Sequence, residues 1–449
     1  MAEHPRGLIV AAPRSGAGKT SITLGLARAL ARAGYRVAPA KTGPDYIDPA
    51  FLAEAAGSPA INLDPWAMDA ATLRGRAAAH ATDHDILLIE GVMGLFDGAV
   101  DGTGSTADLA ATLGLPVILV VDSERQAQSI AALVHGFATW RQDVQIAGVI
   151  LNKVASDRHE TMLRSALEPT GLPCLGSIPR RSDLDLPRRH LGLVLPHAIE
   201  GIADYFDRAG AVMTTHIDFR LLGAIAAPVA SAAQAPSLPP LGQRIAIARD
   251  AAFAFVYPHL LGHWHASGAS LSFFSPLADE APADDADAVF LPGGYPELHG
   301  ATLGAAARFK TGLASARDRG ALIYGECGGY MVLGETLIDR EGGEHPMANL
   351  LPVSTRIDRP RLVLGYRKMR HDSPLPWPRD IRGHEFHYSS QLPSRFSRQL
   401  DARMPASPYI LSPMFAQDDA LGTALPPSGL RLGKVMGSYA HVIEGVKTP

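Results

Sequence analysis

The stretch APRSGAGKTS, residues 12–21, decides the fold of the first half of this chain. It follows an apolar run, residues 7–11, and leads into an Ala-rich segment, residues 19–33, that is typical of a helix. A Gly-rich turn that ends in GKT at a strand-to-helix junction indicates a phosphate-binding loop, because its backbone N–H groups and the helix N-terminus can surround a polyphosphate. The usual pattern has Gly where this chain has Pro13, so the match rests on RSGAGKT.

The side chains at the end of this loop predict the ligand. Lys19 can reach the terminal phosphate oxygens and the Thr20 hydroxyl can hold Mg²⁺, so ATP with Mg²⁺ is the expected ligand. The alternative is a Gly-rich turn with an incidental lysine. The residues expected to contact the nucleotide are Ser15, Gly16, Ala17, Gly18, Lys19, Thr20 and Ser21.

The segments around the loop indicate a doubly wound α/β domain. Between residues 7 and 179, apolar runs such as DILLIE and LPVILVVDS alternate with helix-like segments. This pattern predicts a mostly parallel sheet covered on both faces. Residues 224–242 are rich in Ala, Pro and Ser and carry no charge, which is typical of a linker. We therefore expect a phosphate-loop domain at 1–223, a linker, and a second α/β domain at 243–449, where strand-like runs resume.

Composition narrows the class of protein. The chain has 449 residues, 47% hydrophobic and 19% charged, with a formal net charge of −4. No run approaches the roughly 18 apolar residues that a membrane span needs, and a weakly acidic chain is not typical of nucleic-acid binding. The N-terminal segment does not resemble a signal peptide, and two cysteines in different predicted domains do not indicate disulfides. We expect a cytoplasmic protein that acts on small molecules.

Polar side chains follow several of the predicted strands of the first domain. KTGPDYIDP, residues 41–49, and EGVMGLFDG, residues 90–98, each come directly after an apolar run. The carboxyl ends of parallel strands meet at one edge of a sheet, so these side chains should converge on the nucleotide. The predicted Mg²⁺ ligands are Thr20, Asp45, Asp48 and Glu90.

Three further residues of these strand ends have predicted roles. Lys41 should bind the nucleotide, Asn152 in ILNKV could read the adenine edge, and Asp97 could orient the group that accepts phosphate. The alternatives are structural. The aspartates could be turn or capping residues, and Asn152 could simply close its strand.

The second domain contains a candidate nucleophile in YGECGGYMVLGE, residues 324–335. A strand that ends at Gly-x-Cys-x-Gly before a helix places the Cys327 thiol on a sharp turn, where the helix N-terminus could lower the pKa of the thiol. FLPGGYPE supplies backbone donors near Gly293 and Gly294 for an oxyanion, and MGSYAHV supplies His441 as a base. The alternative is that Cys327 is an inert buried residue.

These residues resemble a class I glutamine amidotransferase domain, in which a cysteine and a histidine hydrolyse glutamine to ammonia. Such domains usually place a glutamate two residues beyond the histidine, whereas here Glu444 lies three residues beyond His441. That spacing is similar to the cobyric acid synthase type of amidotransferase, which works with a Cys-His pair.

The whole chain resembles the cobyrinic acid or hydrogenobyrinic acid a,c-diamide synthase family, in which a dethiobiotin-synthetase-like ATP domain precedes the glutaminase domain. The resemblance rests on motifs that occur in the family's order: RSGAGKT, KTGPDYIDP, EGVMGLFDG, FLPGGYPE, YGECGGYM, GHEFHYS and GSYAH. It implies that Cys327 is the nucleophile, that His441 activates it, and that Asp45, Glu90 and Asp97 belong to the synthetase site.

The resemblance also implies the reaction and the partners. A corrin-ring polycarboxylic acid, with or without cobalt, would be amidated at its a and c acetates for cobalamin biosynthesis. The reaction would consume ATP with Mg²⁺ and L-glutamine, and a homodimer is an option.

Alternatives to this assignment remain open at the level of the sequence. They are a nickel-sirohydrochlorin a,c-diamide synthase, an ATP-dependent switch of the deviant phosphate-loop type, and a non-catalytic amidotransferase-like binding module. The switch fits poorly, because Arg14 stands where such proteins carry a second lysine. GHEFHYS, with His384, Glu385 and His387, could suggest a metal site, but alternate strand residues face opposite sides, which favours a structural or interdomain role.

Overall fold

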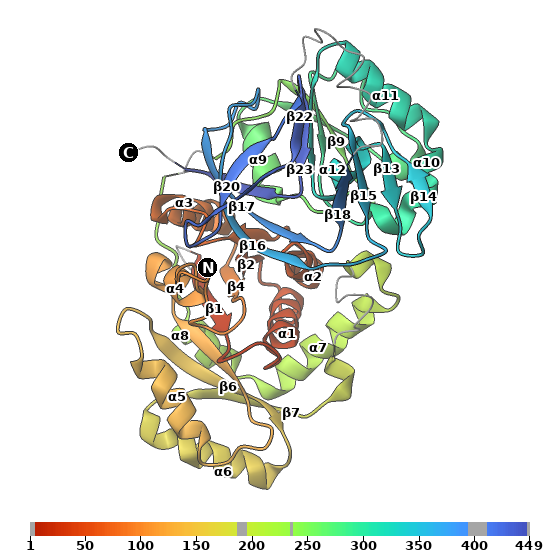
Figure 1. The fold of residues 1–449 in the computed structure, drawn as a ribbon. Coiled ribbons are helices and arrows are strands. Elements are labelled where there is room, and N and C mark those ends of the chain that lie inside the picture. Colours follow the sequence, from red (N-terminus) through yellow and green to blue (C-terminus); the bar gives the residue numbers. More distant parts are fainter. Residues whose placement is uncertain (1–4, 186–194, 234–236, 394–410, 447–449) are drawn as a thin grey trace. The chain divides into compact units, whose positions relative to one another are not determined.

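The structure is a computed structural model that describes residues 5–185, 195–233, 237–393 and 411–446 (Figure 1). The chain divides into two compact units, Met1–Pro236 and Ser237–Pro449. The boundary between the units lies inside the segment predicted as a linker. Part of that segment is nevertheless structured, because Ala227–Pro228 forms a short strand, β8, that pairs antiparallel with β1 (Arg6–Ala11).

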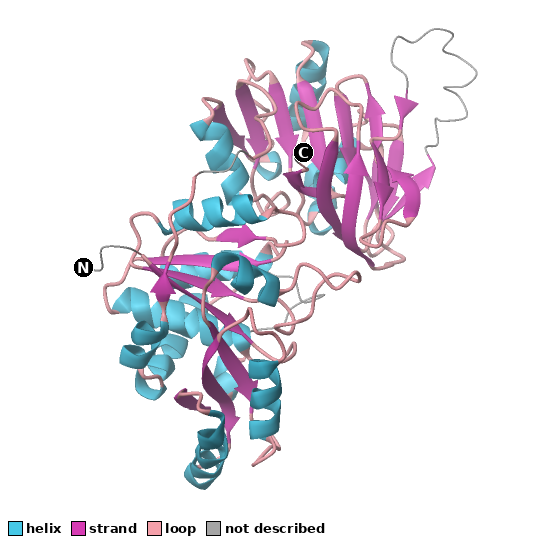
Figure 2. Ribbon diagram, turned by 90° about the vertical axis from the view of Figure 1, so that its left-hand side faces the viewer, coloured by secondary structure: helices cyan, strands magenta, loops and turns pink. Residues whose placement is uncertain are grey.

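The first unit is built on a parallel sheet with the strand order β3-β2-β4-β1-β5-β6-β7, to which β8 is added. Helices lie on both sides of these strands (Figure 2). The elements that follow β1 are α1 (Lys19–Arg32), β2 (Val37–Thr42), α2 (Ile47–Ala56), β3 (Ile61–Leu63), α3 (Ala70–Ala81), β4 (Ile86–Glu90), α4 (Thr106–Leu113), β5 (Val117–Asp122), α5 (Ile130–Thr139), β6 (Ile146–Val154), α6 (Asp157–Leu167), β7 (Cys174–Pro179), α7 (Ile202–His216) and α8 (Phe219–Ile225). The predicted doubly wound α/β fold is confirmed.

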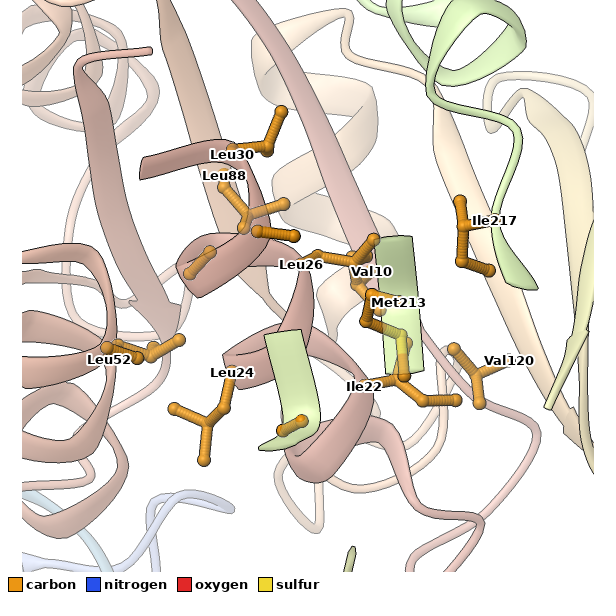
Figure 3. Packing of buried hydrophobic residues seen from close by; sticks show 14 of the residues in the cluster. Val10, Ile22, Leu24, Leu26, Leu30, Leu52, Leu88, Val120, Met213 and Ile217 are labelled. Carbon is orange, nitrogen blue, oxygen red and sulfur yellow. The ribbon is translucent and has the colours of Figure 1, made fainter. Parts of the chain in front are cut away.

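Helices α1 and α7 pack together over one face of this sheet. Leu26 of α1, Val10 of β1 and Met213 of α7 are buried in the same hydrophobic cluster (Figure 3). A Cβ added to Gly25 would lie 2.7 Å from Met213 Cγ and 2.9 Å from the Ala209 carbonyl oxygen, so the close approach of the two helices requires glycine. This packing fixes α1, and with it the phosphate loop at the start of α1.

The second unit contains a parallel sheet core extended by two antiparallel strands, in the order β10-β9-β11-β12-β23-β22-β19. Its helices and the strands of this sheet are β9 (Arg244–Ala248), α9 (Pro258–Ala266), β10 (Ser270–Phe274), β11 (Ala288–Leu291), α10 (Gly300–Ala305), α11 (Ala307–Asp318), β12 (Leu322–Glu326), α12 (Gly328–Leu333), β19 (Leu411–Ser412), β22 (Leu430–Leu432) and β23 (Val435–Ser438). The predicted second α/β fold is therefore confirmed.

Two smaller sheets complete the second unit, in the orders β21-β20-β16-β17-β24 and β14-β13-β15-β18. Their strands are β13 (Thr336–Ile338), β14 (Glu344–Pro346), β15 (Val353–Arg356), β16 (Val363–Arg370), β17 (Asp380–His387), β18 (Ser390–Pro393), β20 (Phe415–Asp418), β21 (Ala424–Ser428) and β24 (His441–Gly445). Residues 335–360 look like loops in the sequence, and that interpretation is wrong for β13, β14 and β15. These short strands are defined by pairing with partners distant in the chain, which no local pattern records.

Among the described residues, every helix is too short or too polar to span a membrane.

Candidate functional site

The phosphate loop joins β1 to α1 with glycines in left-handed conformations, Gly16 at φ 78° and Gly18 at φ 89°. Gly18 is the N-cap of α1 and no side chain caps the helix, so the first N–H groups of α1 are available to an anion. The Asn152 amide nitrogen, at the end of β6, donates to the Ala17 carbonyl oxygen at 2.8 Å. The Asn152 carbonyl oxygen accepts from the Lys153 backbone nitrogen at 2.9 Å. Asn152 thus contacts the phosphate loop, and its predicted contact with adenine stays a prediction.

Glu90, fully buried at the end of β4, is the centre of the polar cluster beside this loop. Its Oε1 accepts hydrogen bonds from Thr20 Oγ1 at 2.6 Å and from Lys41 Nζ at 3.0 Å. Lys19 Nζ lies 3.8 Å from the same oxygen. Glu90 Oε2 is buried and has no hydrogen-bond partner among the residues that the structure describes. A hydroxyl and a carboxylate with an unused oxygen, next to a phosphate loop, fit the ligand preference of Mg²⁺.

Lys41 contacts two of the predicted carboxylates, Asp48 and Glu90. Its ammonium group donates to Asp48 Oδ2 at 2.5 Å and to the Gly91 carbonyl oxygen at 3.2 Å. Although burial lowers the pKa of Lys41, Asp48 and Glu90 raise it above its usual value. Burial likewise acts to raise the pKa of Asp48, but Lys41 holds that pKa below its usual value. Lys41 is therefore a buried cation that compensates the negative charges of two carboxylates. It shares the Glu90 oxygen with Thr20 of the predicted nucleotide site.

Asp45 and Asp97 take up positions in turns. Asp45 Oδ1 accepts from the backbone nitrogens of Ile47 at 2.7 Å and Asp48 at 3.2 Å, so it caps the start of α2. Burial, with the neighbouring Asp48, raises the pKa of Asp45 to about 7. The exposed Asp97 accepts from the Gly94 backbone nitrogen at 2.9 Å. These are the capping and turn contacts that the sequence left as alternatives, and the catalytic roles of both residues stay predictions.

The sequence interpretation missed one residue of this edge, Asp122. It ends β5 and binds Arg14 of the phosphate loop at 3.0 Å and Lys153 at 2.9 Å, both through Oδ2. The available signal was the one that identified Glu90, a carboxylate that ends an apolar strand. The ion pair between Arg14 and Asp122 links the phosphate loop to the end of β5.

In the second unit, Cys327 occupies the predicted sharp turn. It lies between the last residue of β12 and the first of α12, with φ 48° and ψ −106°, a conformation that is strained for a residue with a side chain. Its backbone nitrogen donates to the Ser438 carbonyl oxygen at 2.8 Å. A Cβ on Gly329 would lie 1.9 Å from the Leu291 carbonyl oxygen, so only glycine allows the following helix to sit this close to β11.

The turn faces His441 and the Gly-Gly turn that follows β11. A Cβ built on Gly293 would lie 2.4 Å from His441 Cε1 and 3.2 Å from Cys327 Cβ, so the three residues converge. The nitrogen of Gly294 lies 3.1 Å from the position of a Cβ on Gly328, the residue after Cys327. The structure therefore brings Cys327, His441, Gly293 and Gly294 together at one point.

Burial shifts the pKa values of Cys327 and His441 in opposite directions. It raises the pKa of the Cys327 thiol well above its usual value, with the Glu297 carboxylate adding to the shift and the Gly328 N–H opposing it. It lowers the pKa of His441 well below its usual value, together with His384 and His387. The N–H of Gly328, at the start of α12, acts to lower the thiol pKa as expected, but the loss of solvent outweighs it and the net shift is upward. A neutral imidazole next to a thiol is suited to act as a general base.

The side chains of GHEFHYS are engaged within the second unit. His384 stacks on His441, with ring centroids 5.0 Å apart, and His387 stacks on Tyr439 at 4.0 Å. Glu385 forms a buried ion pair with Arg367 at 2.7 Å. No group of three or more His, Cys, Asp or Glu that could hold a metal ion occurs in the described part of the chain.

Two family models match consecutive parts of the chain. Residues 8–194 match the CobQ/CobB/MinD/ParA nucleotide binding domain, and residues 244–447 match the CobB/CobQ-like glutamine amidotransferase domain. A nucleotide-binding unit followed by a glutamine amidotransferase unit defines a glutamine-dependent, amide-forming ligase.

Curated relatives specify the family. The hydrogenobyrinate a,c-diamide synthase of Brucella suis is 51% identical over 443 residues, which covers 98% of each chain. The hydrogenobyrinate a,c-diamide synthase of Rhodobacter capsulatus is 48% identical over 453 residues, which covers 99% of this chain and all of the relative. The chain belongs to the hydrogenobyrinate a,c-diamide synthase family.

Proposed function

We propose that this protein amidates the a and c acetate carboxylates of hydrogenobyrinate, using ATP and L-glutamine. The observation that carries the proposal is that one chain holds both halves of the chemistry, the Thr20–Glu90 cluster at a phosphate loop and the Cys327–His441 pair at a sharp turn. The names of the full-length relatives favour the cobalt-free ring.

The first unit would activate the ring carboxylate. A carboxylate reacts poorly with ammonia because its leaving group is poor, and transfer of the ATP γ-phosphoryl group gives an acyl phosphate that reacts well. Lys19 would bind the transferring phosphoryl oxygens, and the N–H groups of residues 16–20 would hold the other phosphates. Mg²⁺, held by Thr20 and Glu90 with Asp48 as a further predicted ligand, would supply neutralisation of phosphate charge. Asp45 and Asp97 are proposed to orient the acceptor carboxylate.

The second unit would release ammonia from glutamine. His441 removes the thiol proton as Cys327 Sγ attacks the side-chain amide carbon, and the backbone N–H groups near Gly293 and Gly294 stabilise the oxyanion. The imidazolium returns the proton to the leaving nitrogen, which departs as ammonia. Water then hydrolyses the glutamyl thioester to glutamate. A cytoplasmic location and a homodimer belong to the proposal and rest on the sequence and the resemblance.

Mass spectrometry of the ring product tests this function. The wild-type protein and Cys327→Ala are each incubated with ATP and Mg²⁺, hydrogenobyrinate or cobyrinate, and glutamine or an ammonium salt. We expect two amides on hydrogenobyrinate with the wild type, none with Cys327→Ala and glutamine, and two again with Cys327→Ala and ammonium. Failure of the wild type to amidate either ring with either nitrogen source would overturn the proposal.

A further inference from the structure

The Gly-Gly turn of the second unit carries a buried backbone donor, the N–H group of Gly294. Within the part of the chain that the structure describes, this N–H donates no hydrogen bond. Such a donor is rare in folded proteins, because it has lost its contact with water and has gained no other acceptor. The nitrogen of Gly294 lies 3.1 Å from the position of a Cβ on Gly328, directly after Cys327. A group bound at the nucleophile could therefore be its acceptor.

The peptide bond between Gly293 and Gly294 sets the direction of this N–H group. The Gly293 carbonyl oxygen accepts a hydrogen bond from the Phe255 backbone nitrogen at 2.9 Å, and the two residues form an isolated antiparallel bridge. In a planar trans peptide the C=O and N–H bonds point in opposite directions, and none of the described peptide bonds is cis. The bond to Phe255 therefore turns the Gly294 N–H away from Phe255.

The opposite orientation of the same peptide would hinder glutamine hydrolysis. It would place the Gly293 carbonyl dipole where the N–H group now lies, and that dipole would repel the negative oxygen that forms when Cys327 attacks an amide. Both residues of the peptide are glycines, so their own backbone preferences restrict its rotation little. A contact from outside the turn is needed to hold the productive orientation.

Segment 250–255, which supplies this contact, is itself anchored by a side chain. Asp250 Oδ1 accepts from the Ala252 backbone nitrogen at 2.9 Å, and Asp250 Oδ2 accepts from the Leu277 backbone nitrogen at 2.8 Å. A Cβ on Gly294 would lie 2.1 Å from the Ala252 carbonyl oxygen, so the segment packs directly against the turn. The donor that holds the peptide is thus fixed before any substrate binds.

We propose that Phe255 is a positioning residue of the glutaminase site, whose backbone N–H holds the Gly293 carbonyl so that the Gly294 N–H is directed at the substrate oxyanion. The inference rests on the proposed glutaminase chemistry. Phe255 acts through the peptide and not on the substrate, so its contribution is to the orientation of the oxyanion donor.

The donor acts while the amide carbon is tetrahedral. As the bond from Cys327 Sγ to the amide carbon forms, the electron pair of the C=O π bond moves to oxygen, and the thiol proton passes to His441. The Gly294 N–H binds the resulting oxyanion. The C=O bond then re-forms as the C–N bond breaks, and the nitrogen takes the proton from His441 and leaves as ammonia.

Exchange of a single backbone N–H for an ester oxygen tests this role. Phe255 and, as a control, Phe309 are each replaced by phenyllactate, which keeps the benzyl side chain and removes the N–H. The control also loses one hydrogen bond of the second unit, because the Phe309 nitrogen donates to Asp279 Oδ1 at 2.9 Å. We expect the Phe255 ester to lower kcat for glutamate release by about tenfold or more, with KM for glutamine within about threefold and ammonium-supported amidation unchanged.

The Phe309 ester should match the wild type in both assays. An equal loss of glutamate release in the two esters would overturn the proposal, because the loss of any hydrogen bond would then have the same effect. Glutamate release within about threefold of wild type in the Phe255 ester, or an equal loss of its ammonium-supported amidation, would also overturn it.

A measurement without ATP or the ring separates this inference from the proposed function. 5-Oxopentanoate keeps the chain of glutamine but carries an aldehyde in place of the amide, and the Cys327 thiol adds to that aldehyde to give a thiohemiacetal. Its oxygen occupies the oxyanion position. Protection of Cys327 from iodoacetamide, followed by peptide mass spectrometry, measures this addition, whereas alkylation by iodoacetamide alone forms no oxyanion.

In the Phe255 ester, half-protection should need about tenfold more aldehyde, and the alkylation rate without aldehyde should stay within about threefold of wild type. This result would support the role of Phe255 even if hydrogenobyrinate is not the substrate. Equal protection of the ester and the wild type would overturn the role even if the wild type amidates the ring. A wild type that the aldehyde does not protect would overturn both the inference and the glutaminase chemistry on which it rests.

Discussion

The side-chain amide of Asn152 donates a hydrogen bond to the carbonyl oxygen of Ala17 at 2.8 Å, which fastens the end of β6 to the phosphate loop. The contact is possible because residue 18 is glycine. A Cβ at that position would lie 2.2 Å from the Asn152 nitrogen. Two features of one glycine therefore shape the loop, its left-handed backbone and its missing side chain.

Gly18→Ala should weaken nucleotide binding. The variant strains a residue at φ 89° and displaces Asn152 from the loop. We expect the affinity for ATP, measured by calorimetry, to fall by about tenfold or more. Glutamate release by the second unit should continue.

Gly34→Ala is the matched control for this prediction. Gly34 has a similar backbone conformation, φ 90°, but a Cβ there meets nothing within 4 Å. The control should carry a similar backbone strain of about 1–2 kcal/mol and keep ATP binding. Equal loss of ATP binding in both variants would show that strain, and not the contact with Asn152, is responsible.

Gly293→Ala should block the glutaminase while leaving the synthetase active. The added methyl group would stand 2.4 Å from His441 Cε1 and 3.2 Å from Cys327 Cβ, so the pair has to move apart. Amidation with glutamine should fall by about 10²-fold or more, and amidation with ammonium should persist. Gly304→Ala, whose Cβ would lie 3.3 Å from Pro346 Cδ, is the control and should retain both activities. Full glutamine-dependent activity in Gly293→Ala would contradict the convergence of these three residues.

Local sequence patterns were sufficient for the features that depend on neighbouring residues. The phosphate loop, the strand-end Glu90 and the turn at Cys327 each follow from a short motif at a strand-to-helix junction. The parallel order of the strands then brings their carboxyl ends to one edge, which is why Lys41 and Asp48 could be expected near Glu90.

The features that escaped prediction depend on contacts between distant residues. Glu326 binds the backbone of Val442, 116 residues away, and nothing near Glu326 in the sequence records the pairing that brings β24 there. The raised pKa of Cys327 has the same origin, because it arises from burial by the whole unit and not from the adjacent helix. Motifs can therefore identify a nucleophile, but its environment is a tertiary property.

Glu326 makes a testable contribution to the pH dependence of stability. Burial raises its pKa from 4.5 to about 8, against the opposing hydrogen bonds from Val442 and Tyr324. The folded protein thus binds a proton that the unfolded chain has lost between these values, so this carboxylate makes the free energy of unfolding fall as pH rises through that window. Glu326→Gln removes the effect. We expect the variant's melting temperature, relative to wild type, to increase from pH 5 to pH 9.

The exposed carboxylate Glu341 provides the control for the pH series. The difference in melting temperature between Glu341→Gln and wild type should stay constant over the same range, measured by scanning calorimetry. A constant difference for Glu326→Gln as well would mean that Glu326 remains ionised in the folded protein at pH 5.

Lys41→Met should be the most destabilising of these substitutions. Only 2% of Lys41 is exposed, and its removal takes the nearest cation from Asp48 and Glu90 and leaves Glu90 with Lys19, 3.8 Å away. Loss of one partner from a buried ion pair costs about 3–5 kcal/mol in the free energy of unfolding. Urea denaturation, followed through the unfolding transition of the first unit, would measure this cost. Adding Glu90→Gln to Lys41→Met should recover part of the loss, because one of the two carboxylates that lost Lys41 no longer carries a charge. By contrast, Arg36→Met breaks the exposed pair with Asp85, 2.9 Å apart, and should destabilise the unit much less, because solvent screens that pair. If Lys41→Met costs no more than Arg36→Met, the carboxylates of the predicted Mg²⁺ site do not depend on Lys41 for their charge balance.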